Sequence, residues 1–266
     1  MAAPLHTFDT PEAISVDLSV EFGGARIIAS DRSTTVVAVR PLSEGRRADV
    51  EAAERTRVQF AGGRLEVRTT RTRGLALFIK PGAVEVVIQL PTGSHVKAST
   101  AYGDFDAEGR LGDCFFKTSY GTVHVEDAAA LTLQTSAGNI TAGRIAGIAE
   151  IKCSSGDIRV AATSAAATIK ASAGDIRVES AGAALNARTA YGAISVGRAT
   201  GGRLDLAASY GDVEVGVAGG IATLLDLQSN HGRVRNELDR VDGAQPGDFL
   251  EVHAVTGYGD IRVHRA

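Results

Sequence analysis

The chain has no tryptophan, one methionine and two cysteines among its 266 residues, and aromatic residues make up only 5% of it. No stretch approaches the roughly 20 uninterrupted apolar residues that a membrane-spanning helix needs, so we expect no transmembrane segment. The 28 basic and 31 acidic residues leave a net charge of −3, so neither sign dominates. This balance gives no reason to expect nucleic acid as a partner.

Residues that mark metal sites, disulfides or export are also scarce. Cys114 and Cys153 have no metal-ligand spacing, and we expect two small, partly buried apolar side chains. The six histidines show no ligand spacing either, so we predict no metal and no cofactor. The first residues lack a basic stretch followed by an apolar core, which predicts a cytoplasmic protein. Association with a membrane or envelope would then require a partner.

Glycine is abundant, with 31 residues, and a short pattern recurs around it. A small or aromatic residue precedes the glycine, and often Asp, an apolar residue, any residue and an apolar residue follow. Seven of the eight intervals between these glycines lie between 17 and 21 residues, which is typical of a repeat protein. The motif glycines are Gly103, Gly121, Gly138, Gly156, Gly174, Gly192, Gly211, Gly232 and Gly259.

Each repeat contains two short runs of alternating apolar residues. Apolar residues stand at 151 and 153 before Gly156, and at 158 and 160 after it. A period of two indicates a strand with one buried face. The apolar residues stand at odd positions before the glycine and at even positions after it. This change indicates a corner, where the chain bends and a positive φ is tolerated. Small residues such as Ala98, Ala171 and Ala207 recur at positions expected to face inward, which predicts a thin core.

About 18 residues with two strands and two corners form one turn of a β-solenoid. The sequence therefore predicts an all-β fold, a single-stranded parallel β-solenoid (β-helix), whose coils stack with like residues above like at ~4.8 Å. Residues 93–266 would form the regular repeats, and 236–248 an insertion between the last two coils. Residues 1–92 form a modified N-terminal β region, either decorated first coils or a separate cap. Within it we expect a helix over 48–56 and a strand over 84–90.

Several segments resemble one bacterial family. They are the string from Phe8 to Val16, the string from Ile28 to Arg32, and the serial Gly-Asp-Ile-Arg-Val units. The chain is similar over essentially its whole length to the β-strand-repeat family labelled "putative adhesin", a domain of unknown function common in actinobacteria. The resemblance implies a β-repeat fold and, by its label, a surface role. It implies no catalytic residues.

Every tyrosine in the chain directly precedes a motif glycine. In a stack of coils, Tyr102 would neighbour Tyr120, and Tyr191 would neighbour Tyr210. We interpret these residues as a structural ladder of rings at the corners. The alternative is an aromatic strip that binds a sugar or a peptide, and exposure of the rings would distinguish the two. The five residues are Tyr102, Tyr120, Tyr191, Tyr210 and Tyr258.

Two other features are candidates for function. Aspartates follow five of the motif glycines, and hydrogen bonding at the corner explains them better than calcium binding, because there is one Asp per repeat.

A basic and then apolar segment, 68–80, breaks the repeat pattern. We interpret it as a strand and turn, with a partner-binding or membrane-docking loop as the alternative. Its candidate binding residues are Arg71, Arg73 and Phe78.

These features predict a non-catalytic scaffold that binds a protein partner or associates with itself, because the ends of a solenoid expose unpaired strand edges. The first alternative is a module that binds a glycan or the cell envelope through the tyrosines. The second is a polysaccharide-acting enzyme, which would need a cleft with two carboxylates. No motif with a catalytic mechanism is present, so we expect no enzyme.

Overall fold

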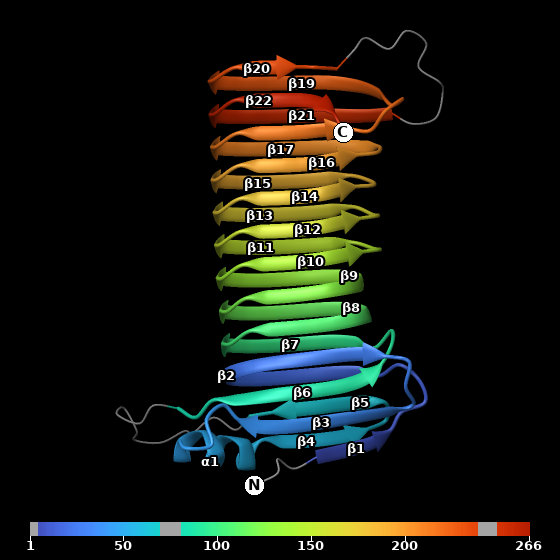
Figure 1. Cartoon of the computed structure of the whole chain (residues 1–266), viewed down its shortest axis with the longest axis vertical. Helices are drawn as coiled ribbons and strands as arrows, with labels where there is room; N and C mark the ends of the chain where they lie inside the picture. Colours follow the sequence, from blue (N-terminus) through green and yellow to red (C-terminus); the bar gives the residue numbers. More distant parts are fainter. Residues whose placement is uncertain (1–4, 70–80, 239–248) are drawn as a thin grey trace. The chain divides into compact units, whose positions relative to one another are not determined.

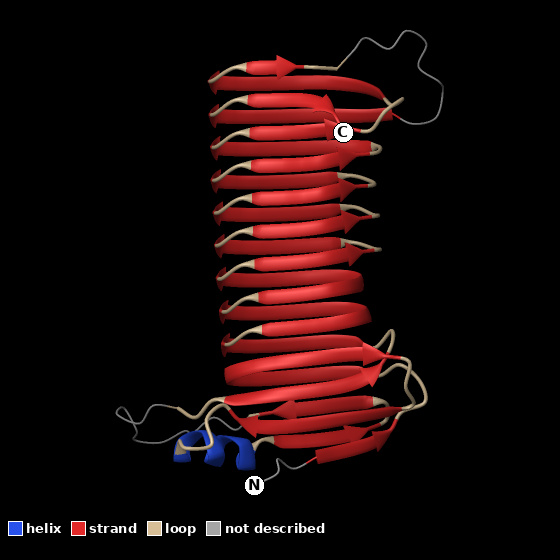
Figure 2. Ribbon diagram, in the orientation of Figure 1, coloured by secondary structure: helices blue, strands red, loops and turns tan. Residues whose placement is uncertain are grey.

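The computed structural model describes residues 5–69, 81–238 and 249–266. The chain divides into two compact units, one comprising residues up to 129 with 133–135, the other 130–132 with 136–266. Most of the described chain is strand, and α1 (Arg47–Arg55) is the single helix in it (Figure 2). The predicted β-solenoid is confirmed. Whether residues 1–92 form a domain of their own stays a prediction.

In the second unit the chain passes alternately through two parallel sheets (Figure 1). One strand from each sheet makes a coil, and the motif glycine lies at the corner between them. The first sheet contains β11 (Ala149–Ser155), β13 (Ala167–Ala173), β15 (Leu185–Tyr191), β17 (Gly202–Tyr210), β19 (Ala222–His231) and β21 (Phe249–Tyr258). The second sheet contains β10 (Ile140–Ile145), β12 (Ile158–Thr163), β14 (Ile176–Ala181), β16 (Ile194–Ala199), β18 (Val213–Val217), β20 (Val234–Asn236) and β22 (Ile261–Arg265).

The register of the coils follows the repeat length. Ile158 pairs with Ile176, which in turn pairs with Ile194. These three side chains are almost fully buried, as are Ile151 and Ile169 in the first sheet. Like residues therefore lie above like, and the thin core between the two sheets is a set of stacked aliphatic columns. Burial of this apolar area is the main term that stabilises the unit.

The coils of the second unit do not stack in the order of the sequence. β21 pairs with β17 on one side and with β19 on the other, and β22 lies in the same way between β18 and β20. The coil 249–265 is thus inserted between the coils 202–217 and 222–236 (Figure 1). The repeat pattern gave no sign of this reordering, and the predicted insertion over 236–248 stays a prediction. Residues 239–248 lie outside the described chain.

The first unit shows the same kind of insertion. The long strand β2 (Ser15–Ser30) makes a whole coil, which pairs in parallel with β5 and β6 on one side and with β7 and β8 on the other. The remaining strands of this unit are β1 (Leu5–Asp9), β3 (Thr34–Pro41), β4 (Arg57–Ala61), β5 (Arg64–Arg68), β6 (Val84–Pro91), β7 (His95–Tyr102), β8 (Phe105–Tyr120) and β9 (Val123–Ala137), whose last residues belong to both units.

Antiparallel strands and α1 complete the first unit. β3 lies between β1 and β6, and β4 forms a hairpin with β5. Gly62 and Gly63 close that hairpin with φ of 55° and 74°, which is the backbone of a two-residue type I′ turn. Asp49 of α1 is buried and accepts a hydrogen bond from the amide of Ala83 at 2.9 Å. The predicted helix and the predicted strand before Pro91 are both confirmed to within a residue.

Candidate functional site

Each motif glycine lies at the corner between the two strands of its coil, against the corner of a neighbouring coil, and this contact explains why glycine is required there. Gly174 has a φ of +137°, a backbone conformation that strongly disfavours other residues. A Cβ on Gly174 would also lie 2.1 Å from the carbonyl oxygen of Gly156 in the neighbouring coil. Gly103 and Gly232 are not among the positive-φ residues, but a Cβ on either would approach a neighbouring glycine carbonyl oxygen to within 2 Å.

The corners carry two ladders of stacked aromatic rings. The first ladder, in the first unit, consists of Phe22, Tyr102 and Tyr120, whose adjacent ring centroids lie 5.4 and 4.9 Å apart. Adjacent rings are within 4° of parallel. Tyr102 and Tyr120 are therefore neighbours, as the repeat predicts. The sequence interpretation missed Phe22, although it stands in the same position before Gly23.

The second ladder, in the second unit, contains Tyr191, Tyr210, Tyr258 and His231. Their successive centroid separations are 5.1, 4.9 and 4.4 Å. The order of the rings follows the spatial order of the coils, so His231 lies at the end. All five tyrosines expose between 48% and 62% of their surface. The rings therefore cover each other and still present their edges to solvent.

A column of carboxylates runs beside the ladders and holds neighbouring coils together. The carboxylate of Asp157 accepts a hydrogen bond from the amide of Asp175 at 3.1 Å, and that of Asp175 accepts one from the amide of Ala193 at 2.8 Å. The side-chain oxygen of Asn139 likewise accepts a hydrogen bond from the amide of Asp157 at 3.0 Å. The predicted role of the aspartates in corner hydrogen bonding is confirmed.

A second column, which the sequence interpretation missed, lies inside most of the corners. There the residue three positions before a motif glycine donates a side-chain hydrogen bond to the carbonyl of the corner glycine in the neighbouring coil. Thr189 donates to Gly174 at 3.1 Å, and Thr256 donates to Gly211 at 2.8 Å. The signal was present in the sequence as a recurrent small or hydroxyl-bearing residue at that position. Thr100, Thr118, Cys153 and Ser229 occupy the other equivalent positions that make this bond.

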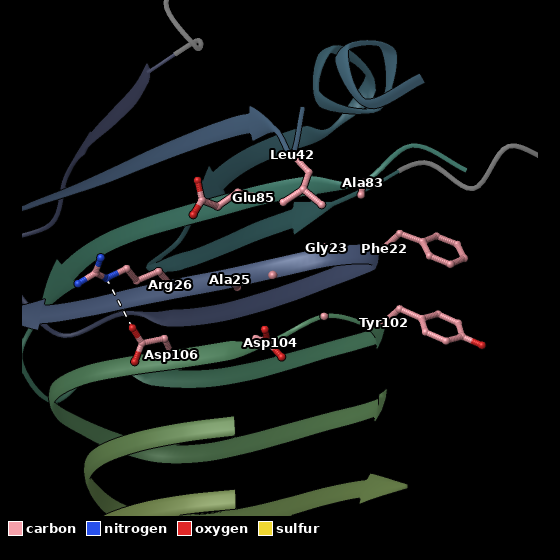
Figure 3. A pocket seen from close by; sticks show the side chains of 12 residues that line it. Phe22, Gly23, Ala25, Arg26, Leu42, Ala83, Glu85, Tyr102, Asp104 and Asp106 are labelled. Atoms are coloured by element: carbon pink, nitrogen blue, oxygen red, sulfur yellow. Dashed lines mark ion pairs between the residues drawn. The ribbon is translucent and has the colours of Figure 1, made fainter. Parts of the chain in front are cut away.

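The first unit contains a cavity of about 560 Å³ beside the start of its ladder (Figure 3). Gly23 and Gly24 line it, and a Cβ on either would meet the backbone of Val84 or Asp104, respectively. Glu85 pairs with Gly24 in the neighbouring strand, and Phe22 and Tyr102 lie at one end of the cavity.

The cavity has an acidic lining that one arginine partly neutralises. The guanidinium of Arg26 lies 2.5 Å from Glu108 and 3.6 Å from Asp106. The hydrogen bond and the charge of Glu108 raise the pKa of Arg26 above its usual value, so this group stays charged. With Glu85 and Asp104 also present, acids outnumber bases, and the lining favours a cation over an anion.

The remaining candidate groups show no further site. Burial raises the pKa of the Cys114 thiol to about 12, and Cys153 is also buried and unpaired, so neither is a reactive thiolate. Across residues 5–69, 81–238 and 249–266, no group of three or more His, Cys, Asp or Glu side chains is arranged to hold a metal. No helix in those ranges is long and apolar enough to cross a membrane. Arg71, Arg73 and Phe78 lie outside the described residues.

Comparison with family models matches residues 26–264, the coils of both units, to the family described as Toastrack DUF4097. The chain belongs to the Toastrack family. This family is a domain of unknown function, so the predicted resemblance to a β-repeat family of that kind is confirmed. A search of curated proteins gave no match.

Solved structures similar to this Toastrack chain have low sequence identity to it. One is described as a putative adhesin from Bacteroides fragilis, which is 12% identical, with a TM-score of 0.47 over 98% of this chain and 96% of that one. Another is described as a putative lipid binding protein from Parabacteroides distasonis, which is 13% identical, with a TM-score of 0.42 over 98% and 96% of the two chains.

Proposed function

We propose that this Toastrack protein is a non-catalytic interaction scaffold, which binds a protein partner or a second copy of itself through its aromatic corners. The observation that carries the proposal is the half-exposed state of both aromatic ladders. A buried ladder would serve packing alone, whereas exposed tyrosine edges offer both an apolar contact and a hydroxyl. Tyrosine is enriched in protein interfaces for this reason.

The rigidity of the corners also supports this role. Each ring is attached beside a glycine whose backbone is fixed by the neighbouring coil, and adjacent rings restrict each other by stacking. A surface that is already ordered loses little conformational entropy when it binds. The ladders therefore present a preorganised strip rather than a set of mobile side chains.

A glycan- or envelope-binding module is the second candidate, and the exposure of the tyrosines favours it as well. Sugars pack against the face of an aromatic ring, however, and within a ladder most faces are covered by the next ring. A polysaccharide-acting enzyme has less support, because the carboxylates Asp106 and Glu108 beside the cavity at Gly23 form ion pairs with Arg26.

The scaffold proposal is tested by partner capture followed by a defined binding measurement. Full-length protein would be used to capture partners from the native cell, and each captured protein would be purified and titrated by calorimetry. We expect the triple variant Y191S/Y210S/Y258S to weaken binding at least about tenfold, since hot-spot aromatics contribute about 2 kcal/mol or more. Sedimentation velocity would test self-association in the same way.

Ile148→Ser is the matched control, because Ile148 is a highly exposed apolar residue outside both ladders. It should leave binding unchanged. If no captured protein and no self-association depends on the ladder, the proposal is wrong. If the tyrosine variants instead lose binding to envelope glycans, the second candidate replaces it.

A further inference from the structure

A column of three cations crosses the first sheet of the second unit. Lys152, Lys170 and Arg188 occupy matching register positions in β11, β13 and β15. Neighbouring strands are ~4.8 Å apart, so the outer two backbone positions are about 10 Å apart. Like charges directly opposite each other on neighbouring strands destabilise a sheet. Strand pairing therefore does not account for this column.

Two of the three cations form no close ion pair with the described residues. Lys152 forms an ion pair with Glu150 at 2.5 Å, and this contact, with a smaller effect of Lys170, lowers the pKa of Glu150 below its usual value. Lys170 and Arg188 are exposed, and neither forms an ion pair with any residue in the described ranges. A protein with a net charge of −3 thus keeps two adjacent positive charges without a close ion pair on this sheet.

The surface between this column and the corner is flat and polar. The next outward-facing positions of β11 and β13 are Ser154 and Ser172, both exposed. At the corner itself, Ser155 pairs with Ala173, and Ala173 pairs with Tyr191. Small residues and hydroxyls therefore separate the cations from the end of the second ladder.

Tyr191 is the end ring of the second ladder, and one of its faces is open. Its neighbour on one side is Tyr210, and its register partner on the other side is Ala173, which has no ring to cover it. Tyr191 is accordingly 62% exposed, against 48% for Tyr210 and 51% for Tyr258, which have rings on both sides.

We propose that Lys170, Arg188, Ser172 and the open face of Tyr191 form a binding site for an acidic saccharide. A carboxylate or sulfate group would accept charge-assisted hydrogen bonds from the lysine and arginine. The serine hydroxyls suit sugar hydroxyls, and the tyrosine face suits the C–H face of a pyranose ring. The patch extends about 10 Å along the strand and one strand spacing, about 5 Å, across the sheet, the size of about one sugar unit.

The local charge favours this ligand over nucleic acid. Binding to a nucleic-acid backbone depends on many phosphate contacts, whereas this patch has two cations. Tyr191 belongs to both this site and the second ladder, but Lys170 and Arg188 belong to this site alone, so their substitution tests it separately from the scaffold function.

The test is calorimetric titration of the full-length protein with defined oligosaccharides. The probes would be oligogalacturonate and oligoglucuronate of four to six units, the methyl ester of each as its neutral counterpart, and inorganic polyphosphate as a charged ligand without sugar. We expect a uronate to bind and its neutral ester to bind at least about tenfold more weakly. K170Q/R188Q and Y191S should each weaken uronate binding by a similar factor.

The matched control is R177Q/R198Q, which removes two exposed arginines from β14 and β16 in the second sheet. It should leave the affinity within about twofold, because a specific site does not depend on total charge. K170Q/R188Q should not lower the free energy of unfolding, since it removes opposed like charges.

Three outcomes would overturn the proposal: no uronate binds, both double variants lose binding equally, or polyphosphate binds as well as the uronate. Partner binding measured with K170Q/R188Q separates this site from the ladders. Retention of the partner with loss of the uronate is expected.

Discussion

At the scale of single residues, each corner is built around a glycine carbonyl. The carbonyl oxygen of Gly156 lies where a Cβ on Gly174 would be, and the carbonyl of Gly174 accepts a hydrogen bond from Thr189. A backbone acceptor at a coil corner thus has a partner inside the protein, as buried polar groups require. The position three residues before Gly174 is Ala171, which has no hydroxyl to donate.

Ala171→Thr should therefore stabilise the protein. Ala171 lies in register between Cys153 and Thr189, whose side chains reach the corner carbonyls of Gly138 and Gly174. A threonine at this position would donate to the carbonyl of Gly156, and one added hydrogen bond contributes about 0.5–1.5 kcal/mol. Urea unfolding at 25 °C, compared with the wild type, measures the gain.

Ala171→Val provides the comparison, because valine has the shape of threonine without the hydroxyl. The threonine variant should be more stable than the valine variant by about 1 kcal/mol. Equal stability of the two variants would show that the hydroxyl makes no such bond.

At the scale of strands and coils, the carboxylate column links neighbouring elements by side chain to backbone bonds. The carboxylate of Asp260, in the turn between β21 and β22, accepts a hydrogen bond from the amide of Arg233 at 2.9 Å. The amide of Asp260 in turn donates to Asp212 at 2.7 Å. The inserted coil is thus joined to both of its neighbours at the same corner.

This link makes stability depend on pH. The hydrogen bond from the Arg233 amide, followed by the charge of Arg233, lowers the pKa of Asp260 below its usual value. The unfolded chain then binds this proton more readily than the folded protein, so stability rises with pH. The contribution is present above about pH 4 and is lost as the pH falls through the folded-state pKa.

Asp260→Asn should reduce the change in free energy of unfolding between about pH 5 and pH 2, because the amide oxygen still accepts the bond but does not titrate in this range. Arg233→Ala should keep most of the wild-type slope, since the main cause is the backbone amide. Identical slopes for the wild type and Asp260→Asn would contradict this assignment.

The sequence was sufficient to predict the strands, the corners and the register, because these depend on a local pattern that each repeat carries. One inward position was predicted wrongly. Ala207 was expected to face inward, but Ala208 is buried and Ala207 pairs with the outward Arg188. Ala208 precedes Gly211 by three residues, as the buried Thr189 precedes Gly192, and this offset from the corner sets the inward face.

The stacking of the tyrosines could also be predicted from the local repeat pattern. The two ladder residues that are not tyrosines were missed. Phe22 and His231 stack with tyrosines because they occupy the same position before a corner glycine. The cavity at Gly24 depends on β2 lying between β6 and β8, a pairing over 60 to 80 residues. No local pattern specifies a pairing at that distance.

At the scale of the whole molecule, each unit contains one coil that is out of sequence order. In the first unit β2 lies between coils formed by later segments, and in the second unit β21 and β22 lie between two earlier coils. Each inserted coil is therefore paired on both of its edges. Unpaired edges are where fraying and unwanted strand addition occur, so the insertion protects these segments.

Engineered disulfides should reveal the coil order of the second unit. His253 of β21 is in register with Asp205 of β17 and with Asp226 of β19, and it forms an ion pair with Asp226 at 2.9 Å. Neighbouring strands bring Cα atoms close enough for a disulfide, whereas two strand spacings, about 10 Å, are too far. D205C/H253C and D226C/H253C, made with Cys114 and Cys153 replaced by alanine, should each cross-link under mild oxidation.

D205C/D226C should stay reduced in the folded protein, because the inserted coil separates the two positions. Stacking in sequence order would place them in adjacent strands and produce the opposite pattern, with D205C/D226C cross-linked and D205C/H253C reduced. Non-reducing electrophoresis with mass spectrometry of the linked peptides distinguishes the two arrangements. Because the corner hydroxyls of Thr256 and Ser229 bond to Gly211 and Gly259, respectively, the inserted order also explains which glycine each one reaches.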